Sequence, residues 1–301
     1  MNELSCSILV WIVLSLTILL SCRNNNPLVT FRDGNTPHQV SIISGTQIGE
    51  YVVEIFEDSN GNIWFGTLGK GVAKYNPTAS EAQPRLRYFS MDDGLADNTV
   101  TAMAGDPQGN LWIGTHSGLS FYNGYTFKNF HQEDGLCNER VSDLLFDAAG
   151  TLWIATWDGV CYYKDNSFHT FPLPVPEMKL EDYQTTMHWV TEILEDAKGN
   201  LWFCRDGYGV LKYDGKSFQH FSKDDGLASD NVQAIAEDDN GLLWFGSRIS
   251  ESDHPDNLKR HGDGGLARFD GHSFVQFAST PGLSNNEIYS ISSGEEGNIW
   301  I

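Results

Sequence analysis

The chain has 301 residues, of which 40% are apolar and 12% aromatic, a composition that suits one large domain with a substantial core. Its net charge of −21, from 19 basic and 40 acidic residues, argues against nucleic acid or anionic lipid as a partner, because both select clusters of Lys and Arg. No Gly-rich phosphate loop lies between a strand and a helix, and no helical period follows residue 22, which indicates an all-β protein.

The N-terminal segment is predicted to be an export signal. Residues 8–20 are an apolar run too short for a comfortable membrane span and typical of a signal peptide. The run ends in Leu19-Leu20-Ser21-Cys22, which resembles the lipobox of bacterial lipoproteins. By that resemblance residues 1–21 are a signal peptide, Cys22 carries a lipid, and residues 22–27 form a tether. The segment before the run has no Lys or Arg, so an uncleaved anchor or a different start site stays open. In either case we expect export to the periplasmic side of a bacterial membrane.

From residue 28 onward the sequence repeats itself. One motif, a turn followed by an apolar residue and a Trp, occurs in six copies, at Trp64, Trp112, Trp153, Trp202, Trp244 and Trp300. A Gly-Leu pair precedes four of them, and the separation from Gly to Trp is 18 residues each time, as from Gly94 to Trp112. A constant spacing indicates the same structure in each copy, and a period of this kind predicts a β-propeller of four-stranded blades.

Each repeat is predicted to form four short strands. In the second repeat we expect them at residues 100–105, 111–115, 119–123 and 126–130, because apolar residues alternate with others there and Gly, Asn and Asp separate the runs. The acidic residue before each Trp motif, such as Asp196, is interpreted as a turn residue rather than a metal ligand. The repeated Trp residues are expected to pack between neighbouring blades.

Both ends of the repeat region are predicted to be incomplete blades. Residues 28–42 match the outer two strands of a blade and have no inner strands of their own, while residues 288–301 match the inner two. Closure between these halves would give six blades, and one further repeat would give seven. Since the last strand stops at Trp300-Ile301, before the usual Gly-Thr, we expect seven blades in a longer protein, with residues 28–301 forming the propeller.

The repeat resembles a known family. The pattern Asp-x-x-Gly-Asn-Leu-Trp-Ile-Gly-Thr, then Tyr-Asn-Gly-x-x-Phe and Asp-Gly-Leu, is similar to the two-component regulator propeller repeats of bacterial hybrid histidine kinases. The resemblance covers about residues 28–301. It implies the periplasmic sensor region of a signalling receptor, with a kinase downstream or in a partner membrane protein, and a ligand that is often an oligosaccharide.

The remaining cysteines and polar residues indicate no catalytic centre. Cys137, Cys161 and Cys204 are an odd number without close spacing, so we expect buried free thiols. No Ser/His/Asp set or paired carboxylates stand out from the repeat, and the nine His residues are scattered. We therefore predict no enzyme activity, metal or cofactor in this segment.

The candidate ligand site lies where the repeats differ. The loops between the second and third strands, and the connections between blades, emerge on one face of a propeller. Two of these are enlarged, at residues 172–189 and 248–265. Trp157 and Tyr208 are predicted to be stacking platforms, because sugar rings need apolar contact and their hydroxyls need planar polar partners. The full predicted set is His116, Trp157, Asp158, Arg205, Asp206, Tyr208 and Arg248.

Two alternative functions stay open. The chain could be a stand-alone, lipid-anchored propeller that binds proteins, or a lyase of the virginiamycin type, whose propellers have a similar Gly-Asn-Leu-Trp-Phe strand. For the predicted site, the alternative is that residues 172–189 and 248–265 are merely longer surface loops that bind no ligand.

Overall fold

The structure is a computed structural model. It describes the backbone of four strands between residues 6 and 41, and backbone and side chains at 48–49, 51–80, 84–175, 188–248, 264–277, 287–294 and 297–301. Predicted loop residues 176–187 and 249–263, within the two enlarged connections, lie outside the described residues.

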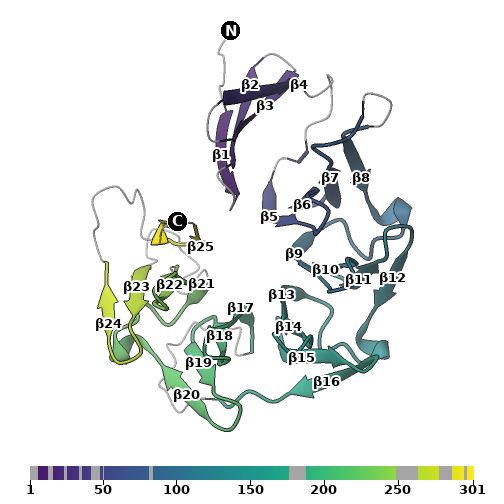
Figure 1. Ribbon diagram of the computed structural model, residues 1–301. Coiled ribbons are helices and arrows are strands. Elements are labelled where there is room, and N and C mark those ends of the chain that lie inside the picture. Colours follow the sequence, from purple (N-terminus) through teal and green to yellow (C-terminus); the bar gives the residue numbers. More distant parts are fainter. Residues whose placement is uncertain are drawn as a thin grey trace, which may run out of the picture.

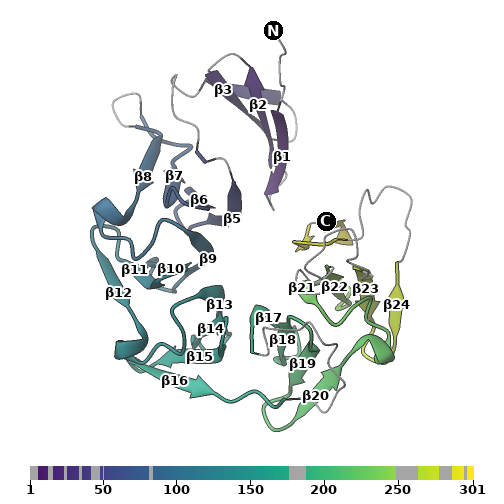
Figure 2. The ribbon, with the colours of Figure 1, turned by 180° about the vertical axis from the view of Figure 1, so that it is seen from behind.

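Six four-stranded antiparallel sheets and one two-stranded sheet form a ring (Figure 1). Within each four-stranded sheet the strands follow chain order, and the first strand lies nearest the centre of the ring, as the reverse view in Figure 2 also shows. The described sheets therefore occupy seven positions of a β-propeller, and the predicted fold class is confirmed.

The strand bounds follow the repeat. The N-terminal sheet contains β1 (Cys6–Ile12), β2 (Leu16–Arg23), β3 (Asn26–Asp33) and β4 (Thr36–Ser41). The next sheets contain β5 (Val52–Glu57), β6 (Ile63–Thr67), β7 (Val72–Tyr75) and β8 (Leu86–Phe89); and β9 (Val100–Gly105), β10 (Leu111–Thr115), β11 (Gly118–Tyr122) and β12 (Phe127–Phe130). They are followed by β13 (Val141–Phe146), β14 (Leu152–Thr156), β15 (Gly159–Lys164) and β16 (Ser167–Phe171); and β17 (Val190–Glu195), β18 (Leu201–Arg205), β19 (Gly209–Tyr213) and β20 (Phe218–Phe221). The last are β21 (Val232–Glu237), β22 (Leu243–Ser247), β23 (Gly265–Phe269) and β24 (Phe274–Gln276), then β25 (Ser292–Ser293) with β26 (Ile299–Trp300).

The two ends of the chain differ in how they match expectation. At the C-terminal end β25 pairs with β26 through Ser292 and Trp300, as expected for the inner half of a blade. At the N-terminal end β3 and β4 pair as predicted, but β1 and β2 supply the inner strands that the sequence was expected to lack. An apolar run rich in Ile, Leu and Val can pair in this way. Cleavage of residues 1–21 and lipidation of Cys22 stay predictions.

The repeated Trp side chains join neighbouring blades, as predicted. Trp202 is fully buried, and its ring centroid lies 5.8 Å from that of Phe245 in the next blade. Its Nε1 donates to Asp196 Oδ2 at 2.8 Å, while Asp196 Oδ1 accepts from the turn amides of Lys198 and Asn200. Burial alone would raise the pKa of Asp196, but these hydrogen bonds outweigh it and lower the pKa below its usual value. Asp196 is therefore a turn residue that anchors its Trp.

The Asp-Gly-Leu motif explains the constant spacing of the repeats. It ends the short 3-10 helices η1 (Met91–Asp93), η2 (Gln132–Asp134) and η3 (Lys223–Asp225) with a left-handed Gly and a buried Leu. Each connection then lies over the loop between the second and third strands, as where the Gly209 amide donates to the Asp230 carbonyl at 2.7 Å. The blade connections and these loops thus share one side of the ring, which we call the loop face.

The expectation of three free thiols is wrong for two of them. Cys137 and Cys161, which are 24 positions apart in the sequence, form a disulfide with their Cα atoms 5.8 Å apart. Cys137 follows Leu136 in a connection that folds over the next blade, which brings it to strand β15. Sequence spacing alone does not reveal that approach. Cys204 is buried and free, as predicted.

Replacing the disulfide should destabilise the propeller. A Cys137→Ser variant is expected to lose about 2–4 kcal/mol of unfolding free energy, because the crosslink restricts the unfolded chain. Urea denaturation of the oxidised protein and the variant measures the loss. The control is Cys204→Ser, which keeps the Cys137–Cys161 disulfide. Its stability should fall under reducing conditions as that of the parent protein does, whereas the stability of Cys137→Ser should not depend on the redox state. An unchanged midpoint for Cys137→Ser would contradict the expectation.

Candidate functional site

Two positions meet on the loop face of each blade. The residue directly after the second strand donates its amide to the carbonyl of the residue directly before the first strand of that blade. His116 pairs in this way with Thr99 at 3.1 Å, Trp157 with Arg140 at 3.1 Å, Asp206 with Trp189 at 3.3 Å and Arg248 with Asn231 at 3.1 Å. Because the first strand is the innermost, these pairs lie close to the centre of the ring.

Four of these side chains form a continuous stack. The rings of Trp157 and Trp189 are stacked with centroids 4.8 Å apart. The guanidinium of Arg140 lies 4.5 Å from the centroid of Trp157, and that of Arg248 lies 5.4 Å from the centroid of Trp189. This Arg–Trp stack crosses three blades, and Trp189 Nε1 donates to Ser142 Oγ at 2.9 Å, which fixes the ring that lies in its middle.

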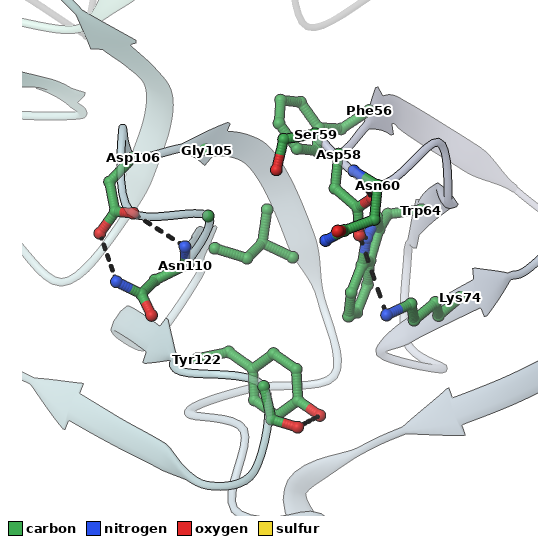
Figure 3. Close-up of a pocket in the computed structure, with 13 residues that line it drawn as sticks. Phe56, Asp58, Ser59, Asn60, Trp64, Lys74, Gly105, Asp106, Asn110 and Tyr122 are labelled. Atoms are coloured by element: carbon green, nitrogen blue, oxygen red, sulfur yellow. Dashed lines mark hydrogen bonds and ion pairs between the residues drawn. The ribbon is translucent and has the colours of Figure 1, made fainter.

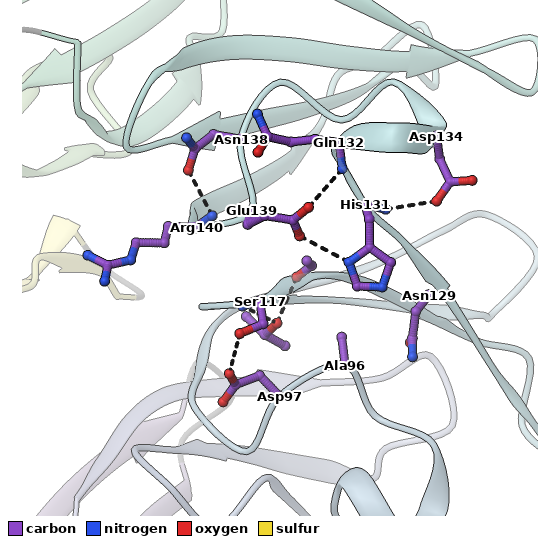
Figure 4. Close-up of polar contacts among 12 residues, drawn as sticks. Ala96, Asp97, Ser117, Asn129, His131, Gln132, Asp134, Asn138, Glu139 and Arg140 are labelled. Carbon is purple, nitrogen blue, oxygen red and sulfur yellow. Dashed lines mark hydrogen bonds and ion pairs between the residues drawn. The ribbon is translucent and has the colours of Figure 1, made fainter.

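Arg140 offers unused donors to a ligand. Its neighbour Glu139 is occupied, because its carboxylate accepts from the Gln132 amide at 2.9 Å and contacts His131 Nδ1 at 3.0 Å. Figure 4 shows the Arg140 side chain pointing away from that cluster. In the described part of the chain the exposed Arg140 guanidinium has no hydrogen bond or ion pair, and stacking leaves the N–H groups in its plane available.

His116 is a neutral neighbour of the stack. Its ring is perpendicular to that of Trp157, with centroids 6.4 Å apart. Burial lowers the pKa of His116, and the positive charge of Arg140 lowers it further, against the opposing effect of Asp97. Asp97 is itself held by Ser117 Oγ at 2.5 Å (Figure 4). It also accepts from the Thr99 amide at 2.7 Å. The imidazole can therefore both donate and accept a hydrogen bond at neutral pH.

The loop after β18 turns inward. Tyr208 is 1% exposed, so its ring is not available as the open stacking platform that we expected from the sequence. The buried Arg205 lies 4.5 Å from its centroid and donates to the Pro174 carbonyl at 3.1 Å. Gly207 and Gly209, which flank Tyr208, have φ of 78° and 65°, and this backbone directs the ring inside.

The predicted set is thus divided. The structure brings His116, Trp157 and Arg248 together around Trp189, and it leaves Asp158 exposed beside them. Arg205, Asp206 and Tyr208 are buried. Sequence reasoning missed Arg140 and Trp189, although both stand directly before an inner strand, where a comparison of the repeats could have found them.

A second group of polar residues lies on the inner strands. Glu54, Asp143 and Glu192 come from β5, β13 and β17, and none was singled out from the sequence. Burial and the charge of Asp143 raise the pKa of Glu54 to about 8, and burial raises that of Asp143 to about 6. Burial and the charges of Asp143 and Glu54 also raise the pKa of Glu192. Asp143 Oδ2 accepts from the Ile193 amide at 2.8 Å and Glu192 Oε2 from the Ile235 amide at 3.0 Å, so these carboxyls link one inner strand to the next.

These features define a repeat-built β-propeller with a stack of Arg and Trp side chains on its loop face. Four segments of the chain, residues 46–69, 94–117, 135–158 and 226–248, match the model of the two-component regulator propeller family. The family resemblance inferred from the sequence is confirmed. Each matched segment leads from a blade connection into the loop after the second strand, so the matches end on the loop face.

Solved structures agree on the fold. The extracellular domain of a hybrid two-component system from B. thetaiotaomicron superposes with a TM-score of 0.66 at 20% identity, over 98% of this chain and 36% of that one. Virginiamycin B lyase from Staphylococcus aureus gives 0.64 at 13% identity, over 95% of this chain and 87% of that one. PorZ from Porphyromonas gingivalis, a surface component of a type-IX secretion system, gives 0.54 at 20% identity, over 77% and 36%. This chain spans about a third of the length of the two-component structure.

Sequence comparison and the described residues give three further negative findings. No curated protein sequence matches the chain. Among the described residues, no helix has the length and apolarity needed to cross a membrane, and no group of three or more His, Cys, Asp or Glu side chains is arranged to hold a metal ion.

Proposed function

We propose that the chain is the extracytoplasmic ligand-sensing propeller of a two-component signalling receptor. In this proposal the loop face binds a carbohydrate or another small, oxygen-rich ligand, and a kinase follows in the same polypeptide or acts as a partner membrane protein. The repeat family supports the signalling role. The observation that carries the ligand site is the Arg–Trp stack, which places aromatic rings and guanidinium groups from three blades side by side.

The stack is better placed to bind the hydroxyl groups of a sugar than to stack against the face of a sugar ring. Trp189 and Arg140 both lie within 5 Å of the Trp157 centroid, so little of the ring face is free. The in-plane donors of Arg140 and the neutral imidazole of His116 can instead bind paired oxygens of a ligand that rests against the half-buried edge of Trp157. Asp158 is exposed nearby and can accept from hydroxyl groups.

The test is a panel of oligosaccharides titrated into the purified protein by calorimetry. Arg140→Ala and Trp157→Ala should each weaken binding of the best ligand by about tenfold or more, because both remove groups at the centre of the site. Tyr125→Ala is the matched control, since Tyr125 is 90% exposed and lies in the turn between β11 and β12, on the opposite side of the ring. Equal affinity in all three variants would overturn the loop-face site.

The same experiment separates the alternative functions. Turnover of a bound ligand would favour the lyase, whose fold this chain shares. Tight capture of a defined protein, with no oligosaccharide bound, would favour the lipid-anchored interaction propeller.

A further inference from the structure

A hollow of about 280 Å³ lies on the side of the ring opposite the loop face. It is formed between the turn that joins β5 to β6 and the turn that joins β9 to β10 (Figure 3). Its wall combines aromatic side chains with amide and charged groups: Phe56, Trp64, Tyr122, Asn60, Asn110, Lys74, Asp58 and Asp106. This size suits one sugar ring or an amino acid rather than an oligosaccharide.

The repeats explain why the hollow is there. At two other contacts between blades, a Glu that ends an inner strand reaches the turn of the preceding blade. Glu195 Oε2 accepts from the Ala148 amide at 2.6 Å, and Glu237 Oε2 accepts from the Ala197 amide at 2.7 Å. Each of these amides belongs to the residue after the turn Asp, so the two contacts are equivalent.

At the hollow the Glu is replaced by glycine. Gly105 ends β9, and the equivalent turn amide is that of Ser59, after Asp58. Among the described residues the Ser59 amide has no acceptor, and both residues line the hollow. At the next contact the position is Phe146, but there the turn residue is Pro107, which has no N–H to satisfy. Of these four contacts, only the one at Gly105 has a donor without an acceptor.

Phe56 takes part of the space that the Glu side chain would fill. A Cβ at position 105 would lie 2.8 Å from Phe56 Cζ, whereas the residues that correspond to Phe56 at the two Glu contacts are Leu145 and Leu194. At this contact the Glu side chain is therefore absent and the Phe56 ring forms an apolar wall in its place. The amide donor of Ser59 is left without the Glu acceptor.

We propose that this hollow binds a small carboxylate, one oxygen of which accepts from the Ser59 amide in the place of the missing Glu. The nearby Asp58 does not prevent this, because Glu195 and Glu237 accept from amides that directly follow turn acids, Asp147 and Asp196, in their own contacts. The Asp58 oxygens are already held by Asn62 and Trp64, and Lys74 Nζ lies 3.8 Å from Oδ2 and offsets the charge of Asp58. The ligand would supply the acceptor that the chain itself supplies elsewhere.

The probes are three acids, each with a neutral counterpart of the same shape: glucuronate with glucose, glutamate with glutamine, and benzoate with benzamide. Calorimetry on the full chain should find at least one acid that binds about tenfold or more tightly than its counterpart, because a charged acceptor on the Ser59 amide is stronger than a neutral one. Failure of all three acids, or equal binding of an acid and its counterpart, would overturn the proposal.

Two variants locate the bound acid. Ser59→Pro removes the donor and keeps the hollow, and the chain tolerates Pro at this turn position, as Pro107 shows. The double variant Phe56→Leu with Gly105→Glu fills the hollow with the residues found at the other contacts. Both should weaken acid binding by about tenfold or more. The double variant should not unfold, because it restores a hydrogen bond that two other contacts make.

Trp157→Ala is the control from the loop face and should leave acid binding unchanged. If Trp157→Ala abolishes binding while Ser59→Pro does not, the acid binds the loop face and this proposal falls, whereas the proposed sensing function stands. If oligosaccharides fail on the loop face while Ser59→Pro weakens acid binding, the proposed function falls and this site stands.

Discussion

Lowering the pH from about 9 to about 6 should stabilise the propeller, because Glu54, Asp143 and Glu192 fold most favourably as neutral acids. Their pKa values are raised in the folded state, to about 8 for Glu54 and about 6 for Asp143. A raised pKa gives stability that is fully present below the unfolded pKa and is lost as the pH rises through the folded value. Each pKa unit corresponds to about 1.4 kcal/mol, so a gain of several kcal/mol is expected over this range.

Glutamine at position 192 should remove much of that dependence. Glu192→Gln keeps an oxygen that can accept from the Ile235 amide but cannot ionise beside Asp143 and Glu54. The variant is expected to melt above the parent protein at about pH 8, with a difference that narrows as the pH falls. Thermal melts at matched ionic strength measure this. Glu195→Gln is the control, because Glu195 bonds a surface turn and should bring no gain.

At still lower pH the trend reverses. Hydrogen bonds from the repeated turns lower the pKa of Asp58, Asp196 and Asp238 against the opposing effect of burial. A lowered pKa gives stability that is lost as the pH falls through the folded value, which for these groups lies below the usual range of an Asp. A melting temperature that rises steadily from acid to pH 9 would contradict the expected effect of the inner-strand carboxyls.

Trp202→Ala should be the most destabilising single change in the repeats, with a loss of about 3–5 kcal/mol, because a fully buried ring would leave a cavity between two blades. Trp202→Phe isolates the contribution of the indole N–H. It keeps most of the apolar contact but leaves Asp196 Oδ2 without that donor, at a cost of about 1–3 kcal/mol.

The chain supplies its own control for this effect. Trp112 occupies the same position two repeats earlier and is buried, but among the described residues its Nε1 has no hydrogen-bond partner. Trp112→Phe should therefore cost less than Trp202→Phe in urea denaturation. Equal losses would mean that the Asp–Trp hydrogen bond adds nothing to stability.

The sequence predicted the fold well because its signal is periodic. Trp202 and its equivalents mark the same strand in each blade, and the spacing from Gly94 to Trp112 reflects a capped turn and two strands of constant length. The site was only partly predictable. Trp157 and His116 were found because they depart from the repeat within a loop, whereas Arg140 and Trp189 lie in the blade connections, directly before the inner strands.

Other details depended on contacts between residues that are far apart in the sequence, which a sequence pattern does not show. Tyr208 stands in a variable loop, as a ligand-binding residue would, but the flanking glycines turn it inward. The disulfide partner of Cys137 lies in the next blade, and the meaning of Gly105 emerges only beside Ser59 and the Glu residues of other contacts. The raised pKa values of Glu54 and Glu192 arise because the inner strands converge.

The capped connections also determine where this scaffold can be redesigned. In three of them the amide of the first residue of the 3-10 helix donates a hydrogen bond to a side chain seven residues further on. The pairs are Met91 with Asn98, Gln132 with Glu139, and Lys223 with Asp230. Because each of these hydrogen bonds spans seven residues, it fixes the length of the connection. Residues 172–189 carry no Asp-Gly-Leu motif, so we expect no such cap in this connection. Foreign peptide segments grafted between β16 and β17 should be accepted where the same grafts elsewhere would break a cap, which makes this junction the natural place to give the propeller a new specificity.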